Sequence, residues 1–283
     1  MIILGDGVDD ATRSVVRELC EADARVSFDD RPKGSRHGEA YRDEIVRAAP
    51  SEYVFYLSDD DLWMPEHVET IIELFEDVGA DAVGARAVAV EPDGTCTLVT
   101  PDLASAGHRD LMRGGFNRIG LSAFAHTRAA YERLPDGWRT TPAGIPTDLY
   151  MWQQWLDEPW PRFGQAGRPT VLGFPSSRRK GVGNADRVRE LEEYLPALTD
   201  PSHRLALLER TIVDDFPRES FLEVHYRRLE EWVANRDEAL VWHQGQLEQV
   251  RARLEDTEAR LEAALQEIEE LRNGGGSSRH RPD

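Results

Sequence analysis

A short apolar and aromatic segment that ends in three consecutive aspartates constrains the fold of this chain most. Residues 53–65 read YVFYLSDDDLWMP. An apolar run of this length, rich in aromatic residues, predicts a buried strand. In open α/β sheets, ligands bind beyond the carboxyl ends of the parallel strands. We therefore expect Asp59, Asp60 and Asp61 to lie at a ligand-binding edge of a sheet.

The segments around this strand alternate between strand and helix patterns. Strands are predicted at 2–4, 25–28, 81–90 and 171–174, and helices at 12–21, 39–49 and 66–76. Such alternation predicts an α/β fold in which a mostly parallel sheet is flanked by helices.

The composition narrows the partners and the compartment. The net charge of −19 over 283 residues disfavours nucleic acid or an anionic membrane as a partner. No stretch is apolar enough over about 18 residues to cross a bilayer. The two cysteines, Cys20 and Cys96, form no CxxC-type pair, and a reducing, cytoplasmic location is expected.

The aspartate triplet predicts a metal site. Adjacent carboxylates repel one another unless a cation lies between them. Ligands that are all oxygen favour Mg²⁺ or Mn²⁺ over softer metals. The alternative is a solvated acidic turn, or carboxylates favoured ahead of a helix that begins near Pro65.

The C-terminal part is predicted to be helical and charged. Residues 184–237 are interpreted as a helical extension, 238–272 as a coiled coil and 273–283 as a flexible, Gly-rich tail. The coiled coil is predicted by a seven-residue repeat of Leu240, Leu247, Leu254, Leu261 and Ile268. A homo-oligomer would follow from it. A single charged helix that docks on its own domain is the alternative.

Four motifs in order resemble the family 2 glycosyltransferases, which have a GT-A fold. The resemblance covers about residues 1–183 and rests on Asp6-Gly7 with Asp10, on Tyr41-Arg42-Asp43, on Asp59 to Asp61, and on Thr147-Asp148. It implies an enzyme that uses a nucleotide-sugar donor.

The resemblance also implies roles for the acidic triplet. Asp61 is expected to bind Mn²⁺ or Mg²⁺, with Asp59 as a second ligand that also lies nearer the ribose of the donor. Asp60 is the register alternative and is expected in the donor site. A divalent metal acts as a Lewis acid on the diphosphate leaving group.

Three further residues complete the expected site. Asp6 is placed to accept a hydrogen bond from the nucleobase or the ribose, and Arg42 is expected to contact the diphosphate. Asp148 is the candidate general base, because an acceptor hydroxyl is a poor nucleophile until a base takes its proton. Each also has an ordinary structural alternative: a turn residue for Asp6, a surface arginine for Arg42 and a helix cap for Asp148.

One base and one metal, with no second nucleophile, predict an inverting transfer to an acceptor hydroxyl on an unidentified glycan, lipid-linked or protein acceptor. Thr147 stands where the family has glutamate.

The chain begins at what resembles the second strand of the domain, so we expect the first strand and helix either to precede Met1 or to be missing. A degenerate domain that acts as an oligomeric scaffold is the main alternative function. A phosphatase built on Asp59 and Asp61 is disfavoured by Leu62-Trp63, where such enzymes have Thr or Val.

Overall fold

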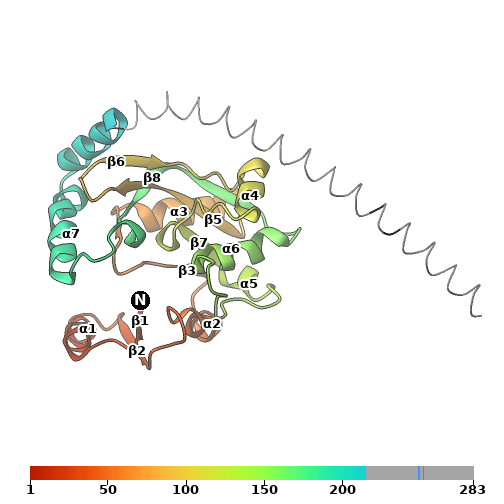
Figure 1. Ribbon diagram of the computed structural model, residues 1–283, viewed down its shortest axis with the longest axis horizontal. Helices are drawn as coiled ribbons and strands as arrows, with labels where there is room; N and C mark the ends of the chain where they lie inside the picture. Colours follow the sequence, from red (N-terminus) through yellow and green to blue (C-terminus); the bar gives the residue numbers. More distant parts are fainter. Residues whose placement is uncertain (215–247, 249–250, 252–283) are drawn as a thin grey trace, which may run out of the picture. The chain divides into compact units, whose positions relative to one another are not determined.

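The computed structural model describes residues 1–214, 248 and 251 (Figure 1). Its strands are β1 (Ile2–Asp6), β2 (Ser27–Arg31), β3 (Tyr53–Phe55), β4 (Leu62–Trp63), β5 (Ala82–Val90), β6 (Cys96–Val99), β7 (Phe124–Thr127) and β8 (Phe163–Gly173). Its α-helices are α1 (Asp10–Ala22), α2 (Glu39–Ala48), α3 (His67–Val78), α4 (Ala106–Arg113), α5 (Arg128–Tyr131), α6 (Thr147–Asp157) and α7 (Asn184–Thr199). Short 3₁₀ helices η1 (Leu121–Ala123) and η2 (Ser176–Arg178) lie between them, and residues 201–214 are also helical.

The strands of the described residues form two sheets, and the prediction of a mostly parallel sheet is wrong. β1 and β2 pair in parallel as a two-stranded sheet. The larger sheet has the order β3-β7-β5-β8-β4, with β6 paired to β5. In it only the β5–β8 pair is parallel, and the other pairs are antiparallel. The fold is therefore α/β with a mixed sheet.

The connections explain this mixture. Parallel neighbours need a long crossover, which α1 supplies between β1 and β2. Asp9 caps this helix by accepting a hydrogen bond from the Thr12 amide at 2.8 Å. β5 and β6 are instead joined by a tight turn, in which the Gly94 amide bonds the Glu91 carbonyl at 2.8 Å. A short turn of this kind can join only antiparallel strands.

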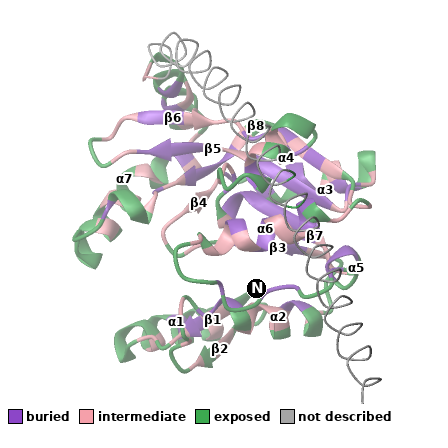
Figure 2. Cartoon of the chain, turned by 45° about the vertical axis from the view of Figure 1, so that its right-hand side comes forward, coloured by how far each residue is buried: buried purple, intermediate pink, exposed green. Residues whose placement is uncertain are grey.

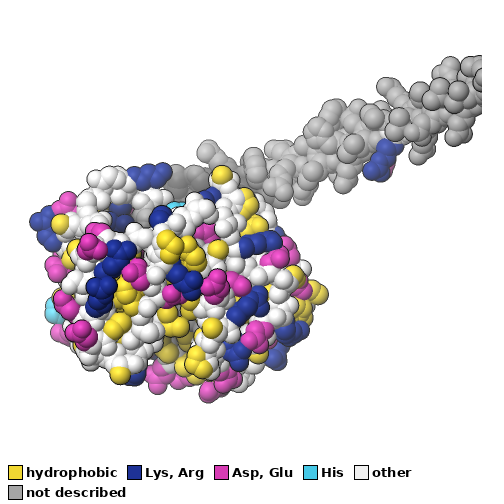
Figure 3. All heavy atoms as spheres, turned by 90° about the horizontal axis from the view of Figure 1, so that it is seen from below, with side chains coloured by type: hydrophobic (Ala, Val, Ile, Leu, Met, Phe, Trp, Pro, Cys, Tyr) yellow, Lys and Arg dark blue, Asp and Glu magenta, His cyan; other side chains and the backbone are white. Residues whose placement is uncertain are grey.

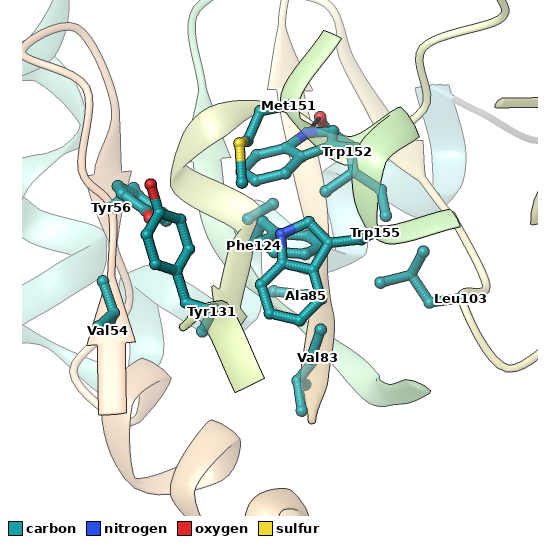
Figure 4. Packing of buried hydrophobic residues seen from close by; sticks show 14 of the residues in the cluster. Val54, Tyr56, Val83, Ala85, Leu103, Phe124, Tyr131, Met151, Trp152 and Trp155 are labelled. Carbon is teal, nitrogen blue, oxygen red and sulfur yellow. Dashed lines mark hydrogen bonds between the residues drawn. The ribbon is translucent and has the colours of Figure 1, made fainter. Parts of the chain in front are cut away.

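The main core is rich in aromatic side chains contributed by α6 and the larger sheet. Trp152 and Trp155 of α6 are buried against Phe124 of β7, and the rings of Phe124 and Trp152 stack with centroids 3.8 Å apart (Figure 4). Val54, Tyr56 and other buried residues of α2 to β8 belong to the same cluster. This packing fixes α6, and with it the start of that helix, against the sheet.

A second core cluster joins the sheet to the helices that follow it. It contains Met64, Leu172 and Phe174 together with Ala197 of α7 and Leu207. Figure 2 shows that buried residues concentrate on the strands of the larger sheet, whereas α1 and α7 are largely exposed. The described residues up to 214 belong to one compact unit.

The remaining predictions for the C-terminal part fall outside the described residues. These are the helical extension beyond residue 214, the coiled coil over 238–272 and the tail over 273–283. Within the described part, no helix is both long and apolar enough to cross a membrane. On the face drawn in Figure 3, acidic and basic side chains are interspersed, so this face carries no extended patch of one sign.

Candidate functional site

The aspartate triplet lies in the turn between β3 and β4, so it follows a strand, as the sequence predicts. Asp59 is exposed and receives no hydrogen bond from a described residue. Asp60 and Asp61 are partly buried and turn to different partners. The three carboxylates therefore differ in what they have available for a ligand.

Asp60 connects the triplet to the chain that follows β8. Its carboxylate accepts hydrogen bonds from Ser58 Oγ at 2.6 Å, from Ser176 Oγ, and from Arg187 Nη2 of α7 at 2.6 Å. Burial acts to raise the pKa of Asp60, but the hydrogen bonds from Ser176, Ser58 and Arg187 outweigh it and hold the pKa below its ordinary value. Asp60 thus lies in an internal ion pair, with both oxygens occupied by protein donors.

Asp61 is held by one side chain and one amide. Ser122 Oγ donates to its Oδ2 at 2.6 Å, and the Phe174 amide donates to its Oδ1 at 3.0 Å. Burial raises its pKa, and the negative charges of Asp60 and Asp59 add to this effect, whereas the two hydrogen bonds oppose it. Its negative charge therefore lacks a compensating cation among the described residues.

Asp59 and Asp61 offer carboxylate oxygens, which are the type of ligand that Mg²⁺ and Mn²⁺ prefer. In the described part of the chain, no group of three or more His, Cys, Asp or Glu side chains gathers as a closed metal site. Mg²⁺ is, however, commonly held by one or two carboxylates together with substrate phosphates and water. Each oxygen of Asp61 accepts one hydrogen bond and keeps further acceptor capacity.

Asp6 ends β1 and lies inside the loop over residues 33–38. Its Oδ1 accepts from the Gly34 amide at 2.6 Å, and its Oδ2 pairs with Lys33 Nζ. Gly38 has φ +66, and a Cβ there would lie 2.8 Å from Asp6 Cγ. Burial acts to raise the pKa of Asp6, but Lys33 and Gly34 lower it overall. The carboxylate expected to contact the nucleotide is thus engaged by its own loop.

Arg42 extends from α2 and stacks on an aromatic ring. Its guanidinium carbon lies 4.8 Å from the centroid of the Trp138 ring. It makes no hydrogen bond or ion pair with any residue that the structure describes, although the charges of Glu39, Asp148 and Asp6 act on it. Burial lowers its pKa. A desolvated guanidinium whose donors are free is suited to an anionic ligand.

Asp148 lies in the first turn of α6. Its Oδ1 accepts from the Leu149 amide at 2.8 Å, and the Asn117 side chain also hydrogen bonds to it. Burial raises its pKa, while the hydrogen bonds and the charge of Arg42 oppose the shift. A partly desolvated carboxylate of raised pKa is the kind of group that serves as a general base.

A buried chain of hydrogen bonds supports the ring beneath Arg42. Trp138 Nε1 donates to Tyr56 Oη at 2.8 Å, and Tyr56 Oη lies 2.7 Å from His126 Nε2. The Nδ1 of His126 faces the Thr127 carbonyl at 3.0 Å, so it carries the proton and Nε2 accepts from Tyr56. Burial lowers the pKa of His126 to about 4, which keeps the ring neutral. His126 is therefore part of the scaffold.

Arg42 interacts electrostatically with both Asp6 and Asp148. The aspartate triplet is instead hydrogen bonded to Ser122, Ser176 and Arg187. Sequence reasoning missed these three residues and Trp138, which no motif marks. Lys33 did have a sequence signal, because it is one of only two lysines in the chain. In the structure its Nζ also donates to the Arg36 carbonyl at 2.9 Å.

Comparison with known proteins gives a family likeness for the N-terminal part. The family model described as glycosyl transferase family 2 matches residues 1–120. No curated protein matches the chain at a significant level. The fold is thus α/β, with a family 2 glycosyltransferase match over less than half of the chain.

Solved structures of S. aureus TarS resemble the chain distantly. TarS 1–349 has a TM-score of 0.48 at 12% identity, over 76% of this chain and 62% of that one. The same fragment in complex with UDP-GlcNAc gives a TM-score of 0.49 at 12% identity, over 76% and 63%. A longer TarS structure gives 0.43 at 12% identity, over 76% and 37%. The chain spans less than two thirds of the length of these proteins.

Proposed function

We propose that the chain is an inverting glycosyltransferase that moves a sugar from a nucleotide-sugar donor to an acceptor hydroxyl. The observation that carries this proposal is Arg42: a partly buried guanidinium, stacked on Trp138, with no hydrogen-bonding partner among the described residues. Such a group is stabilised when an anion with paired oxygens arrives, and a diphosphate is an anion of this kind. The family 2 match over residues 1–120 supports the same class of donor.

Asp148 is proposed as the general base. In the reaction it takes the proton of the acceptor hydroxyl while that oxygen forms a bond to the anomeric carbon. The bond from this carbon to the phosphate oxygen breaks on the opposite face, and the electron pair leaves with the nucleoside diphosphate. Arg42 stabilises the charge that develops on this leaving group. One displacement inverts the configuration.

Asp59 and Asp61 are proposed to hold Mn²⁺ or Mg²⁺. When bound, the metal supplies Lewis-acid stabilisation of the diphosphate. Asp60 is proposed to act indirectly, because its ion pair with Arg187 orients the turn that carries the other two carboxylates. Asp6 and Lys33 are proposed to face the nucleoside, with the ion pair between them opening or adjusting when the donor binds.

A further strand is proposed to complete the nucleotide-binding half. Among the described residues β1 pairs only with β2, and β3 pairs only with β7, so each has one unpaired edge. Two-stranded sheets are only marginally stable by themselves. An added strand would satisfy such an edge.

A catalytically degenerate domain remains the second candidate, and two observations favour it. Asp6 pairs with Lys33 and Asp60 with Arg187, so two expected donor-binding carboxylates already have internal partners. In this case the proposed coiled coil would make the chain an oligomeric scaffold. The cytoplasmic location also stays a proposal.

A turnover assay separates the two candidates. The protein is incubated with Mn²⁺ and each of a panel of UDP-, GDP- and dTDP-sugars, and release of the nucleoside diphosphate is measured. The enzyme proposal expects release from at least one donor, and its loss in Asp61→Ala and Asp148→Asn. No release and no binding of any donor by the intact chain would favour the scaffold.

A further inference from the structure

The backbone amide and carbonyl of Thr141 are held by two charged side chains, one at the first residue of α2 and one three residues before it. The Thr141 amide donates to Glu39 Oε1 at 2.8 Å, and its carbonyl accepts from Arg36 Nη1 at 3.1 Å. Glu39 and Thr141 are 1% and 2% exposed. Two side chains three residues apart thus hold the two peptide units on either side of Thr141, more than a hundred residues further along the chain.

Arg36 extends this hold towards α6. It also donates to the carbonyls of Pro142 at 2.7 Å and Ile145 at 3.4 Å. The Ile145 amide bonds the Pro142 carbonyl at 3.4 Å, which closes a turn directly before α6. Asp148 follows Ile145 by three residues, in the first turn of that helix. Arg36 therefore restrains the backbone that leads into the proposed base.

Neither Arg36 nor Glu39 forms an ion pair with another of the described residues. The second oxygen of Glu39 accepts from the His37 amide at 2.7 Å, so this buried carboxylate is satisfied by backbone amides. Burial acts to raise the pKa of Glu39, but the amides of Thr141, Glu39 and His37 lower it overall, which keeps the group ionised. The hydrogen bonds of both charged groups are thus used to fix backbone.

α2 affects the proposed base Asp148 through Arg42 as well as through Glu39. Glu39 and Arg42 are three residues apart on α2, so their side chains lie on neighbouring parts of one helix face. Glu39 holds the segment before Asp148, and Arg42 acts on the charge of Asp148. The position of α2 therefore sets the placement of Asp148 relative to Arg42.

We infer that Arg36 and Glu39 are positioning residues that clamp the 141–145 segment and thereby fix Asp148 beside Arg42. This inference rests on the proposed function, because it assigns the clamp to the base of that reaction. Misplacing a reacting group by about 1 Å costs on the order of 10²-fold in rate. Loss of the clamp should therefore lower kcat while donor binding at Arg42 persists.

The test compares Arg36→Ala, Arg36→Lys and Glu39→Gln in the full chain. We expect Arg36→Ala to lower kcat about 10- to 100-fold with less than about twofold change in the donor KM. Arg36→Lys should recover part of the loss, because an ammonium still donates to a carbonyl. Arg25→Ala is the matched control: it removes an exposed positive charge whose side-chain hydrogen bonds go to Asp23 rather than to a backbone carbonyl. It should leave kcat within about twofold.

The pH profile distinguishes positioning from general destabilisation. A loosened segment exposes Asp148 to water, so its raised pKa should fall and the acidic limb of kcat should move to lower pH in Arg36→Ala. The inference is overturned if Arg36→Ala keeps the wild-type kcat, or if kcat and KM change together with no recovery in Arg36→Lys and no shift of the limb.

Amide hydrogen exchange decides the clamp independently of turnover. Exchange at Thr141 and in the first turn of α6 should become about tenfold faster in Arg36→Ala and Glu39→Gln, but not in Arg25→Ala. If the wild-type protein releases no product from any donor, the proposed function fails and the exchange rates still test the clamp. Unchanged exchange in both variants would refute it.

Discussion

The guanidinium carbon of Arg42 lies 4.8 Å from the centre of the Trp138 ring, and both the ring N–H and the backbone N–H of Trp138 are hydrogen bonded. Trp138 Nε1 donates to Tyr56 Oη at 2.8 Å, and its backbone amide donates to Tyr131 Oη at 2.7 Å. Stacking on a fixed ring orients the guanidinium plane without using its donors. The protein thus holds a positive group in place and leaves its hydrogen bonds for a ligand.

Replacing Arg42 should weaken donor binding specifically. Hydrogen bonds to charged groups contribute about 1.5–3 kcal/mol each, so Arg42→Ala should raise the donor KM or Kd at least about tenfold. Arg42→Lys should recover little, because an ammonium lacks the planar fork. Arg47→Ala is the control on the same helix, since Arg47 already pairs with Asp43 at 2.9 Å. Equal donor affinities in Arg42→Ala and Arg47→Ala would contradict the assignment.

Asp148→Asn should lower kcat by about 10²–10⁴-fold with a small change in donor affinity. The folded pKa of Asp148 is raised, so the carboxyl stabilises the fold when protonated, and this contribution is lost as the pH rises through the folded pKa. Asp148→Asn should therefore be at least as stable as the wild type near neutral pH. Thermal melts across pH, beside steady-state kinetics, check both statements; a destabilised and fully active variant would refute them.

Asp60 should matter more for stability than for the chemical step. Asp60→Ala removes three hydrogen bonds and leaves Arg187 without its partner, so we expect a loss of about 2 kcal/mol in the free energy of unfolding. The folded pKa of Asp60 is lowered, so its contribution is present above the unfolded pKa and is lost as the pH falls through the folded value.

Urea unfolding measures this loss, with Asp186→Ala as the control on α7. Asp186 pairs with Arg189 on the exposed surface, and such pairs contribute about 0–1 kcal/mol. A similar stability in the two variants would show that Asp60 does not connect the triplet to α7.

Removal of divalent metal should abolish transfer, and added Mn²⁺ or Mg²⁺ should restore it. Asp61→Asn keeps an acceptor for the Phe174 amide but removes the charge, so it should fold and bind Mn²⁺ in the presence of nucleoside diphosphate at least about tenfold more weakly. Titration with Mn²⁺ checks this. Full activity in excess chelator would show that the triplet holds no catalytic metal.

The proposed coiled coil predicts a dimer or higher oligomer. The seven-residue repeat from Leu240 to Ile268 would bury one face of each helix against a partner. Sedimentation of the intact chain should give an oligomer that becomes a monomer when residues 238–283 are deleted. A monomeric intact chain would refute the prediction.

The local patterns predicted several elements well. The strand predicted at 2–4 and the helix predicted at 12–21 are observed as β1 and α1, whereas the strand predicted at 25–28 is observed slightly later, as β2. The placement of the aspartate triplet after β3 follows from the same kind of pattern. These signals are local, although the strands pair with partners further along the chain, such as Ile2 with Ser27 and Tyr53 with Thr127.

The mixed sheet and the internal partners of the aspartates depend on distant parts of the chain. β5 pairs with residues of β7 that come 40 to 44 positions later and with residues of β8 that come 81 to 84 positions later, and alternation alone does not set the direction of these strands. The hydrogen bond of Ser122 to Asp61 and the ion pair of Arg187 with Asp60 likewise join residues far apart in sequence. No motif predicts such contacts, so the triplet was expected to be freer than it is.

Calorimetric titration of the intact wild-type protein with UDP, GDP and dTDP in the presence of Mn²⁺ measures whether Arg42 serves a donor site. We expect that at least one nucleoside diphosphate binds, and that its affinity falls about tenfold or more in Arg42→Ala but not in Arg47→Ala. Absence of binding by every nucleoside diphosphate, or equal binding by wild type and Arg42→Ala, would contradict it.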